Sequence, residues 1–344
     1  MSDRSAPRRD SRSGRVLLAF LGFVLALAIA GAATALFAWS WVQGQFDAPG
    51  PTAEETLVVV PRGEGLIQIA NRFEREGVIS DARLFRLLVT LEEADRDLRA
   101  GEYAFPPESS MREVLERVRE GIVVQYPVTF AEGLTSAMIV RILEASDVLT
   151  GEITETPPEG SLLPETYLVQ RGTPRAEILE RMANDQTALI AALWPNRADD
   201  LPFDTVEEAI ILASIVEKET GIAAERPRVA AVFVNRLRRG MSLDSDPTII
   251  YGITGGEPLG RGIRRSELDN TANVYNTYHF AGLPPGPIAN PGRESIAAVL
   301  NPADTRDLFF VADGTGGHVF ATTYAEHQRN VANWRRVERE RGGR

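Results

Sequence analysis

The pattern of apolar and polar positions divides the chain into successive segments. Residues 16–42 carry no charged side chain, and their apolar run is long enough to cross a bilayer core of roughly 30 Å. Residues 43–56 are rich in Pro, Gly and acidic side chains and are expected to form a linker. Short apolar runs with helix and strand spacing then occupy residues 57–125, and denser ones occupy residues 126–344. The pattern therefore predicts a transmembrane helix, a small module and a larger domain.

The small module has a simple order of expected elements. Residues 57–60 are typical of a strand, and residues 66–75 have the apolar spacing of a helix. A second helix capped by Ser80 and a strand at residues 101–105 follow. Further helix starts are marked by capping boxes at Ser110–Glu113 and Thr205–Glu208. Strand, two helices and strand is the order of a LysM module, a small glycan-binding fold, so a LysM-like βααβ module is expected over residues 57–125.

Charge is distributed unevenly along the chain. The whole sequence has a net charge of −11, yet residues 1–15 hold five arginines against two aspartates. The acidic body argues against nucleic acid as a partner. The basic tail before the apolar run predicts a cytoplasmic N-terminus, with everything after about Gly44 outside the cytoplasm. A cleaved signal peptide is the alternative, although its apolar region is usually shorter than this one.

Composition removes several kinds of chemistry. The chain has no cysteine and three histidines, which excludes thiol catalysis, Cys-ligated metals and His-rich metal sites. We therefore expect no metal and no cofactor. Ser214 and Lys218 are one residue too far apart for the Ser-x-x-Lys motif of penicillin-binding proteins. His318 and His327 have no third ligand near them in sequence, and residues 313–317 are expected to form a hairpin turn.

One apolar helix ends in a pair of glutamates. Residues 209–216 are apolar on nearly every face, which is typical of a helix buried in a domain. At about 100° per residue, Glu217 lies on the same wall as Ala213 and Ile210, whereas Glu219 faces another side. Loss of solvation on an apolar wall favours a protonated carboxyl, which a general acid requires. Glu217 is thus the candidate catalytic acid.

A structural reading of Glu217 is also open. The residue stands in the last turn of the expected helix, where it could pair with Lys218 or Arg226 on the surface.

Downstream segments supply candidate substrate contacts. Asn235 interrupts the apolar side of an expected helix, and the stretch 275–292 combines Tyr, Asn, Thr, Gly and Pro. Tyrosine rings cover sugar faces, and Asn and Thr meet hydroxyl and N-acetyl groups. A well-packed Pro-rich loop is the alternative. The candidates for substrate binding are Glu219, Asn235, Asp246, Thr248, Tyr251, Tyr275, Asn276, Thr277, Tyr278 and Pro284.

A set of motifs in fixed order resembles one known family. The motifs are Leu163-Pro-Glu-Thr-Tyr167, Ala213-Ser-Ile-Val-Glu-Lys-Glu-Thr220, Val232-Phe-Val-Asn-Arg-Leu237, Asp246-Pro-Thr248, Tyr275-Asn-Thr-Tyr278, Gly282-Leu-Pro-Pro-Gly-Pro-Ile288, Phe310-Val-Ala-Asp313 and Gly317-His-Val-Phe320. Together they closely resemble the endolytic murein (peptidoglycan) transglycosylases, the MltG or YceG-like family, over nearly the whole chain. Asp244 departs from the family, whose members often have Gln at this position, so no role is carried over to it.

The resemblance implies a fold and an activity. It implies an α+β catalytic domain over residues 126–344, anchored in the bacterial inner membrane with that domain in the periplasm. The implied reaction cleaves the MurNAc–GlcNAc β-1,4 bond of nascent glycan strands and leaves 1,6-anhydroMurNAc ends. The first glutamate of Glu217-Lys-Glu is implied as the single acid and base. Peptidoglycan synthases are candidate partners, and a non-catalytic peptidoglycan-binding scaffold is the alternative function.

Overall fold

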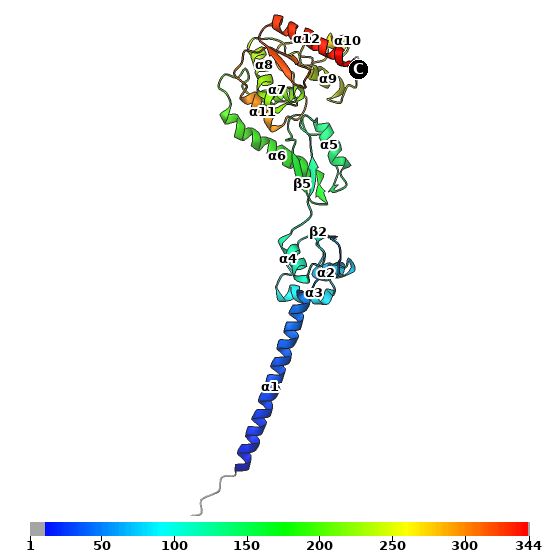
Figure 1. Cartoon of the computed structure of the whole chain (residues 1–344), viewed down its shortest axis with the longest axis vertical. Coiled ribbons are helices and arrows are strands. Elements are labelled where there is room, and N and C mark those ends of the chain that lie inside the picture. The colour runs from blue at the N-terminus through cyan, green and yellow to red at the C-terminus, as the bar shows by residue number, and fades with distance from the viewer. Residues whose placement is uncertain (1–10, 343–344) are drawn as a thin grey trace, which may run out of the picture. The chain divides into compact units, whose positions relative to one another are not determined.

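The protein is a mixed α/β chain that divides into two compact units. The computed structural model describes residues 11–342, and the boundary between the two units lies between Val124 and Gln125 (Figure 1). Residues 1–10 of the expected basic tail lie outside the described residues.

The first unit is a long helix followed by a small module. Its elements are α1 (Ser11–Phe46), β1 (Thr56–Val60), α2 (Leu66–Arg75), α3 (Ala82–Leu91), β2 (Gly101–Phe105) and α4 (Met111–Glu120). Strands β1 and β2 pair antiparallel, with Thr56 opposite Phe105 and Val60 opposite Gly101. The strand–helix–helix–strand order matches the hydrophobic pattern, and α4 follows it. The likeness to LysM stays a prediction.

Helix α1 extends beyond the end that the sequence predicted. It was expected to stop at residue 42 but continues to Phe46, because the Phe46 ring is completely buried in the core of the module. Arg112 of α4 donates from Nη2 to Gln43 Oε1 at 2.9 Å and from Nε to Asp47 Oδ1 at 2.7 Å. The expected linker therefore begins as helix and packs on the module. Residues 16–46 are long and apolar enough to span a membrane, a test that a signal sequence also passes.

The second unit contains the remaining elements. These are β3 (Tyr126–Thr129), α5 (Ser136–Ala145), β4 (Leu149–Thr150), β5 (Thr166–Val169), β6 (Thr173–Pro174), α6 (Arg175–Leu193), α7 (Val206–Glu219), α8 (Arg226–Arg238), α9 (Asp246–Thr254), α10 (Arg265–Leu268), α11 (Arg293–Leu300), β7 (Phe309–Ala312), β8 (His318–Ala321) and α12 (Tyr324–Gly342), with short 3₁₀ turns at Trp194–Asn196 and Ala223–Glu225. The strand pairs are β3–β5 and β7–β8, both antiparallel, and the short parallel pair β4–β6.

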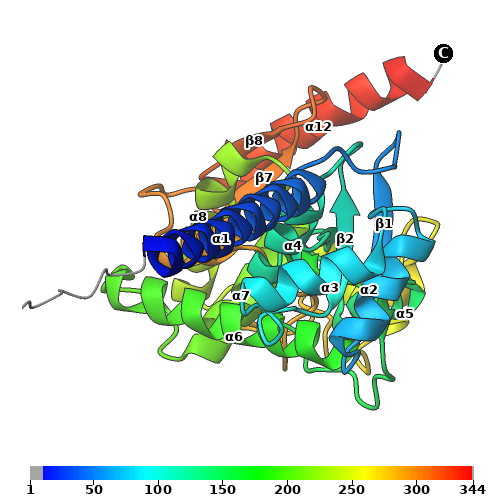
Figure 2. The same ribbon diagram turned by 90° about the horizontal axis from the view of Figure 1, so that it is seen from below.

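Helix α7 is the centre of the larger core. It packs against α8 and α11, and its residues from Ala209 to Val216 are buried except for the half-buried Ile211. A second apolar cluster joins β3, β5, α5 and the start of α6. The hairpin expected at residues 313–317 is confirmed, since it joins β7 to β8, and α12 runs beside these two strands (Figure 2). Helix α7 is thus enclosed by the larger core over most of its length.

Candidate active site

The end of α7 places two carboxyl groups in different surroundings. The helix starts at a capping box, in which the Thr205 hydroxyl accepts from the Glu208 N–H and the Glu208 carboxylate accepts from the Thr205 N–H. It ends at Glu219, because Thr220 is extended. Glu217 and Glu219 therefore share the last turn of a buried helix but point in different directions.

Glu219 lines a cavity of about 340 Å³. The side chains around the cavity come from α7, α8, the 243–246 segment, Tyr278, β7 and α12. They are Glu219, Arg236, Leu243, Asp244, Asp246, Tyr278, Phe309, Phe310, Tyr324 and His327. Acidic groups, one guanidinium and several aromatic rings thus surround one space, a composition suited to a polar ligand with apolar faces.

The Glu219 carboxyl group is held in a form that exchanges a proton near neutral pH. Burial is the main cause that raises its pKa to about 7, and the negative charge of Asp246 raises it further. The Ser245 hydroxyl donates to Glu219 Oε1 at 2.6 Å. This hydrogen bond and the charges of His318 and Arg236 lower the pKa of Glu219. A substantial fraction of Glu219 is therefore protonated at neutral pH.

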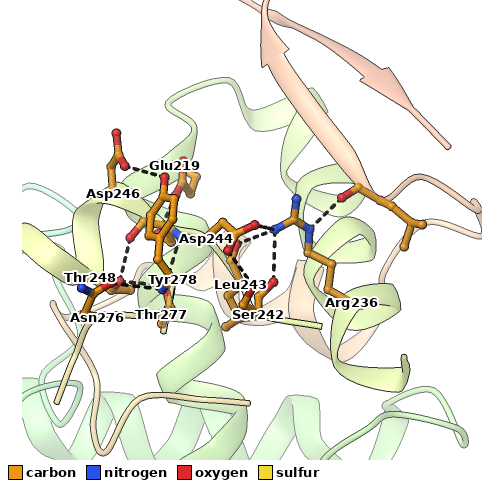
Figure 3. Close-up of polar contacts among 12 residues, drawn as sticks. Glu219, Arg236, Ser242, Leu243, Asp244, Asp246, Thr248, Asn276, Thr277 and Tyr278 are labelled. Atoms are coloured by element: carbon orange, nitrogen blue, oxygen red, sulfur yellow. Dashed lines mark hydrogen bonds and ion pairs between the residues drawn. The ribbon is translucent and has the colours of Figure 1, made fainter. Parts of the chain in front are cut away.

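Asp246 and Tyr278 form a hydrogen-bonded pair on the same cavity wall. The Tyr278 hydroxyl donates to Asp246 Oδ1 at 2.7 Å (Figure 3). Burial and this hydrogen bond raise the pKa of Tyr278, so the phenol stays protonated and remains a donor. Asp246 stands in the first turn of α9, where a negative charge is favourable for the helix dipole. The pair holds a carboxylate close to Glu219.

The loops that carry this pair are locked by buried polar side chains. Thr248 and Thr277 are fully buried, and their hydroxyls are hydrogen-bonded at 2.9 Å (Figure 3). Thr277 Oγ1 also accepts from the Ser245 N–H at 3.0 Å. Asn276 is fully buried as well, and its amide donates to the carbonyls of Leu268 and Asn270 at 2.9 and 3.1 Å. These three sequence candidates thus shape the cavity wall without lining it.

Arg236 and Asp244 are cavity residues that the sequence interpretation missed. Arg236 Nη1 donates to Asp244 Oδ2 at 2.9 Å and to the carbonyl of Leu243 at 3.0 Å, while Nε donates to the carbonyl of Leu308 at 2.7 Å (Figure 3). Asp244 has a left-handed backbone with φ of 49°, which aspartate tolerates better than most residues. The signal for Arg236 was its place directly after Asn235 in a family motif. Arginine side chains, however, are mostly exposed, so nothing in the sequence indicated that this one lines a cavity.

Glu217 lies in a different environment from the one that periodicity predicted. Its side chain is 5% exposed, and it faces the guanidinium of Arg226, whose Nη2 lies 3.3 Å from Oε1. The Gly292 N–H donates to its Oε2 at 2.9 Å, and Arg226 also pairs with Glu132 at 3.1 Å. The pairing with Arg226 that the structural reading of Glu217 predicted is present, but the pair is buried and does not lie on the surface. Glu217 does not line the cavity of Glu219.

The other candidates are spread around the domain. Asn235 donates to the carbonyls of Thr305 and Asp307 at 2.9 and 3.1 Å and so fixes a loop. The rings of Tyr251 and Tyr275 contact each other at 4.8 Å between centroids and pack against the core. Pro284 is buried. The structure brings Glu219, Asp246 and Tyr278 together at the cavity. The other four candidates, Asn235, Tyr251, Tyr275 and Pro284, do not line it. Their predicted role in binding stays a prediction.

A metal centre finds no support in the described part of the chain. No three His, Asp or Glu side chains among the described residues are grouped so that they could hold a metal ion.

Comparison with known proteins connects the chain to cell-wall enzymes. The endolytic murein transglycosylase of Streptococcus pneumoniae is 26% identical over 323 residues, which is 80% of this chain and 57% of the relative. That of Bacillus subtilis is 26% identical over 303 residues, which is 78% of this chain and 82% of the relative. The chain thus spans little more than half the length of the streptococcal relative.

A solved structure and a family model complete the comparison. A crystal structure of a YceG-like protein from Listeria monocytogenes is 27% identical to this chain, with a TM-score of 0.48, and the match covers 81% of this chain and 99% of that one. The model of the YceG-like family matches residues 58–333, which span both the small module and the domain that carries the cavity. The chain therefore belongs to the YceG-like family.

Proposed function

We propose that this protein is a membrane-anchored endolytic peptidoglycan transglycosylase in which Glu219 is the catalytic acid. Two relatives named endolytic murein transglycosylase support the reaction class. The observation that carries the residue assignment is the cavity, because it is lined by Glu219 with a pKa raised to about 7 and is not lined by Glu217. A proton donor must both reach the substrate and hold its proton near the working pH.

The reaction needs only one carboxyl group. Most glycosidases use two, one of them to activate water or to attack the sugar. In a lytic transglycosylase the C6 hydroxyl of N-acetylmuramic acid is the nucleophile. Protonated Glu219 donates its proton to the glycosidic oxygen as the bond from C1 to that oxygen breaks. The C6 oxygen then bonds to C1, and the Glu219 carboxylate takes the C6 hydroxyl proton.

The atoms and protons of this reaction balance in its products. One strand ends in 1,6-anhydroMurNAc, the other gains a free GlcNAc hydroxyl, and Glu219 recovers its proton without water. The attacking hydroxyl is part of the same sugar, so it acts at a high effective concentration.

The neighbours of Glu219 have supporting roles in this proposal. The Asp246 carboxylate disfavours early loss of the Glu219 proton and adds negative charge where C1 becomes positive. The Ser245 hydroxyl donates a hydrogen bond to Glu219 Oε1, which leaves Oε2 free to protonate the glycosidic oxygen. Rings such as Tyr278, Phe309 and Tyr324 provide flat surfaces for sugar faces.

The proposal gives Glu217 a structural role. Its contacts with Arg226 and the Gly292 N–H tie the end of α7 to α8 and to the start of α11. A rigid last turn keeps Glu219 directed into the cavity. The catalytic role of Glu217, which helix periodicity and the family resemblance both indicate, remains the competing assignment.

The membrane anchor and the small module complete the proposal. Helix α1 would cross the inner membrane once, with the basic N-terminus in the cytoplasm and the catalytic unit in the periplasm. The module at residues 57–125 would bind glycan in the manner of LysM. Anchored there, the enzyme would cut nascent strands internally and so set their length, with peptidoglycan synthases as partners.

Digestion of peptidoglycan by the full-length chain in detergent tests the proposed activity. Mass spectrometry of the products should show new 1,6-anhydroMurNAc ends and strands shortened from within. Reducing ends in place of anhydro ends would contradict the transglycosylase reaction. Binding without any new ends would favour the non-catalytic scaffold.

A further inference from the structure

A second cavity of about 460 Å³ lies in the second unit, and none of its lining residues lines the cavity of Glu219. Its walls come from the 159–161 loop, α6, the first half of α7 and the 285–287 segment. The 285–287 segment lies within the family motif Gly282–Ile288, and the 159–161 loop comes just before the motif that starts at Leu163. The proposed cleavage uses neither segment.

Most of the side-chain donors around this cavity are committed to the protein. The Ser161 hydroxyl donates to the carbonyl of Pro158 at 2.7 Å, and the Thr187 hydroxyl donates to that of Ala183 at 2.9 Å. Gln186 Nε2 donates to the carbonyl of Gly160 at 3.0 Å. No Lys, Arg or His lines the cavity. Apart from the second Nε2 hydrogen of Gln186, its lining side chains therefore offer a ligand hydrogen-bond acceptors.

Two of the acceptors are incompletely satisfied. Gln186 is 2% exposed, and its Oε1 has no hydrogen-bond partner within the described residues. Glu159 is half-buried, and its two carboxylate oxygens share one donor, the Ser136 N–H, at 3.0 and 3.2 Å. Burial raises the pKa of Glu159 to about 7. The exposed carboxylate of Glu207 adds negative charge at the edge.

The rest of the wall is apolar. Ile190, Val206, Ile210 and Ile211 line the cavity together with the prolines of the 285–287 segment. A ligand that fits must therefore combine an aliphatic body with a group that donates hydrogen bonds and carries positive charge. A carboxylate would be repelled by the ionised form of Glu159.

We propose that this cavity binds an aliphatic primary ammonium group, with the alkyl chain against the isoleucines and the ammonium at Glu159 beside the free oxygen of Gln186. An ammonium has three donors and no acceptor, which complements such a lining. The diamino acid of a peptidoglycan peptide stem carries a group of this kind. That identification of the source rests on the proposed function, whereas the ammonium site does not.

Ligand-detected NMR titration of the full-length chain in nanodiscs tests the site. The probes are 5-aminopentanol, 1,5-pentanediol and 5-hydroxypentanoate, which share a chain length and differ in charge. The amine should bind at least about tenfold more tightly than the diol, and the carboxylate should not bind. The Glu159→Gln variant keeps an acceptor for the Ser136 N–H and should lose the preference for the amine. The Glu155→Gln variant, changed at an exposed position nearby in the chain, should retain it.

The pH dependence sharpens the test. An ammonium favours ionised Glu159, so amine affinity should rise by about tenfold between pH 6 and pH 8, and diol affinity should stay level. Three other titratable groups face Glu159 or the cavity. Tyr251 and Tyr275 have pKa values raised by burial and by Glu159 and do not titrate in this range, and the Glu207 carboxyl is at the edge.

A steric pair of variants separates the cavity from the surrounding surface. Thr187→Phe should block amine binding, whereas Ala188→Phe, next to it but outside the lining, should not. Equal affinity for amine and diol, or an unchanged preference in Glu159→Gln, overturns the site. A chain that cuts strands without preferring the amine overturns this site alone. A chain that prefers the amine but cuts no strand overturns the proposed function alone.

Discussion

Two glutamates in one helical turn have opposite surroundings in this protein. Glu217 is enclosed by Arg226 and the Gly292 N–H and ties three helices together. Glu219, two residues later, accepts from a neutral hydroxyl and lines a cavity. Burial alone therefore does not identify a catalytic acid. The partner groups supplied by distant segments decide whether a buried carboxyl serves as a fixed acceptor or as an exchangeable proton donor.

The largest expected effect comes from changing the carboxyl group in the cavity. The Glu219→Gln variant keeps an oxygen for the Ser245 hydroxyl but cannot give or take the proton. In the proposed mechanism one residue serves both steps, so formation of anhydro ends should fall by roughly 10²- to 10⁴-fold or more. The thermal melt should show a folded protein. A folded Glu219→Gln variant with near-normal activity would remove Glu219 from the mechanism.

Breaking the ion pair between Glu217 and Arg226 should chiefly lower the stability of the folded protein. Arg226→Leu leaves Glu217 buried without its cation, and loss of one member of a buried ion pair typically costs about 3–5 kcal/mol. Chemical denaturation should show this loss. The double variant Glu217→Leu/Arg226→Leu should recover much of it, because no unpaired charge remains. A double variant no more stable than Arg226→Leu would show that the pair is not the source of the loss.

A smaller effect is expected from the charge beside Glu219. Asp246→Asn removes a negative charge that raises the pKa of Glu219, so this pKa should fall. In the proposed mechanism activity depends on protonated Glu219, and the alkaline limb of kcat/KM should therefore move to lower pH. Asp269→Asn, an exposed change outside the cavity lining, is the matched control. A limb that stays in place, or moves to higher pH, would mean that Asp246 does not act through Glu219.

The smallest effect concerns stability and pH. The folded-state pKa of Glu219 is raised, so the stability that the carboxyl contributes is full at acidic pH and is lost as pH rises through about 7. Glu219→Gln should therefore increase Tm relative to the wild type at pH 8 more than at pH 4.5. The same difference at both pH values would indicate that Glu219 titrates normally in the folded protein.

Local signals in the sequence predicted several helices well. The helix at residues 66–75 has the bounds that its periodicity indicated, and the capping boxes at Ser110 and Thr205 form as expected. Where two caps compete, the local signal is weaker. Asp81, not Ser80, caps α3, because its carboxylate reaches the N–H groups of Arg83 and Leu84.

The candidate site was harder to predict because distant segments build it. Periodicity correctly gave Glu217 and Glu219 different faces of α7, but it could not show which face meets a cation. The Gly292 N–H lies 75 residues from Glu217 in the sequence, and the cavity includes Phe309 and Tyr324 from still farther along the chain. Arg236 was hidden for the same reason, since its acceptors at residues 243–244 and 308 become neighbours only in the fold.

The pH profile of Glu217→Gln tests the central claim most directly. Glutamine can still accept from the Gly292 N–H, and Arg226 keeps its contact with Glu132, so the variant should fold. The account predicts kcat/KM within a few fold of the wild type, with the alkaline limb still near pH 7, where Glu219 titrates. A folded Glu217→Gln variant that forms no anhydro ends, beside an active Glu219→Gln variant, would contradict the account and assign the acid to Glu217.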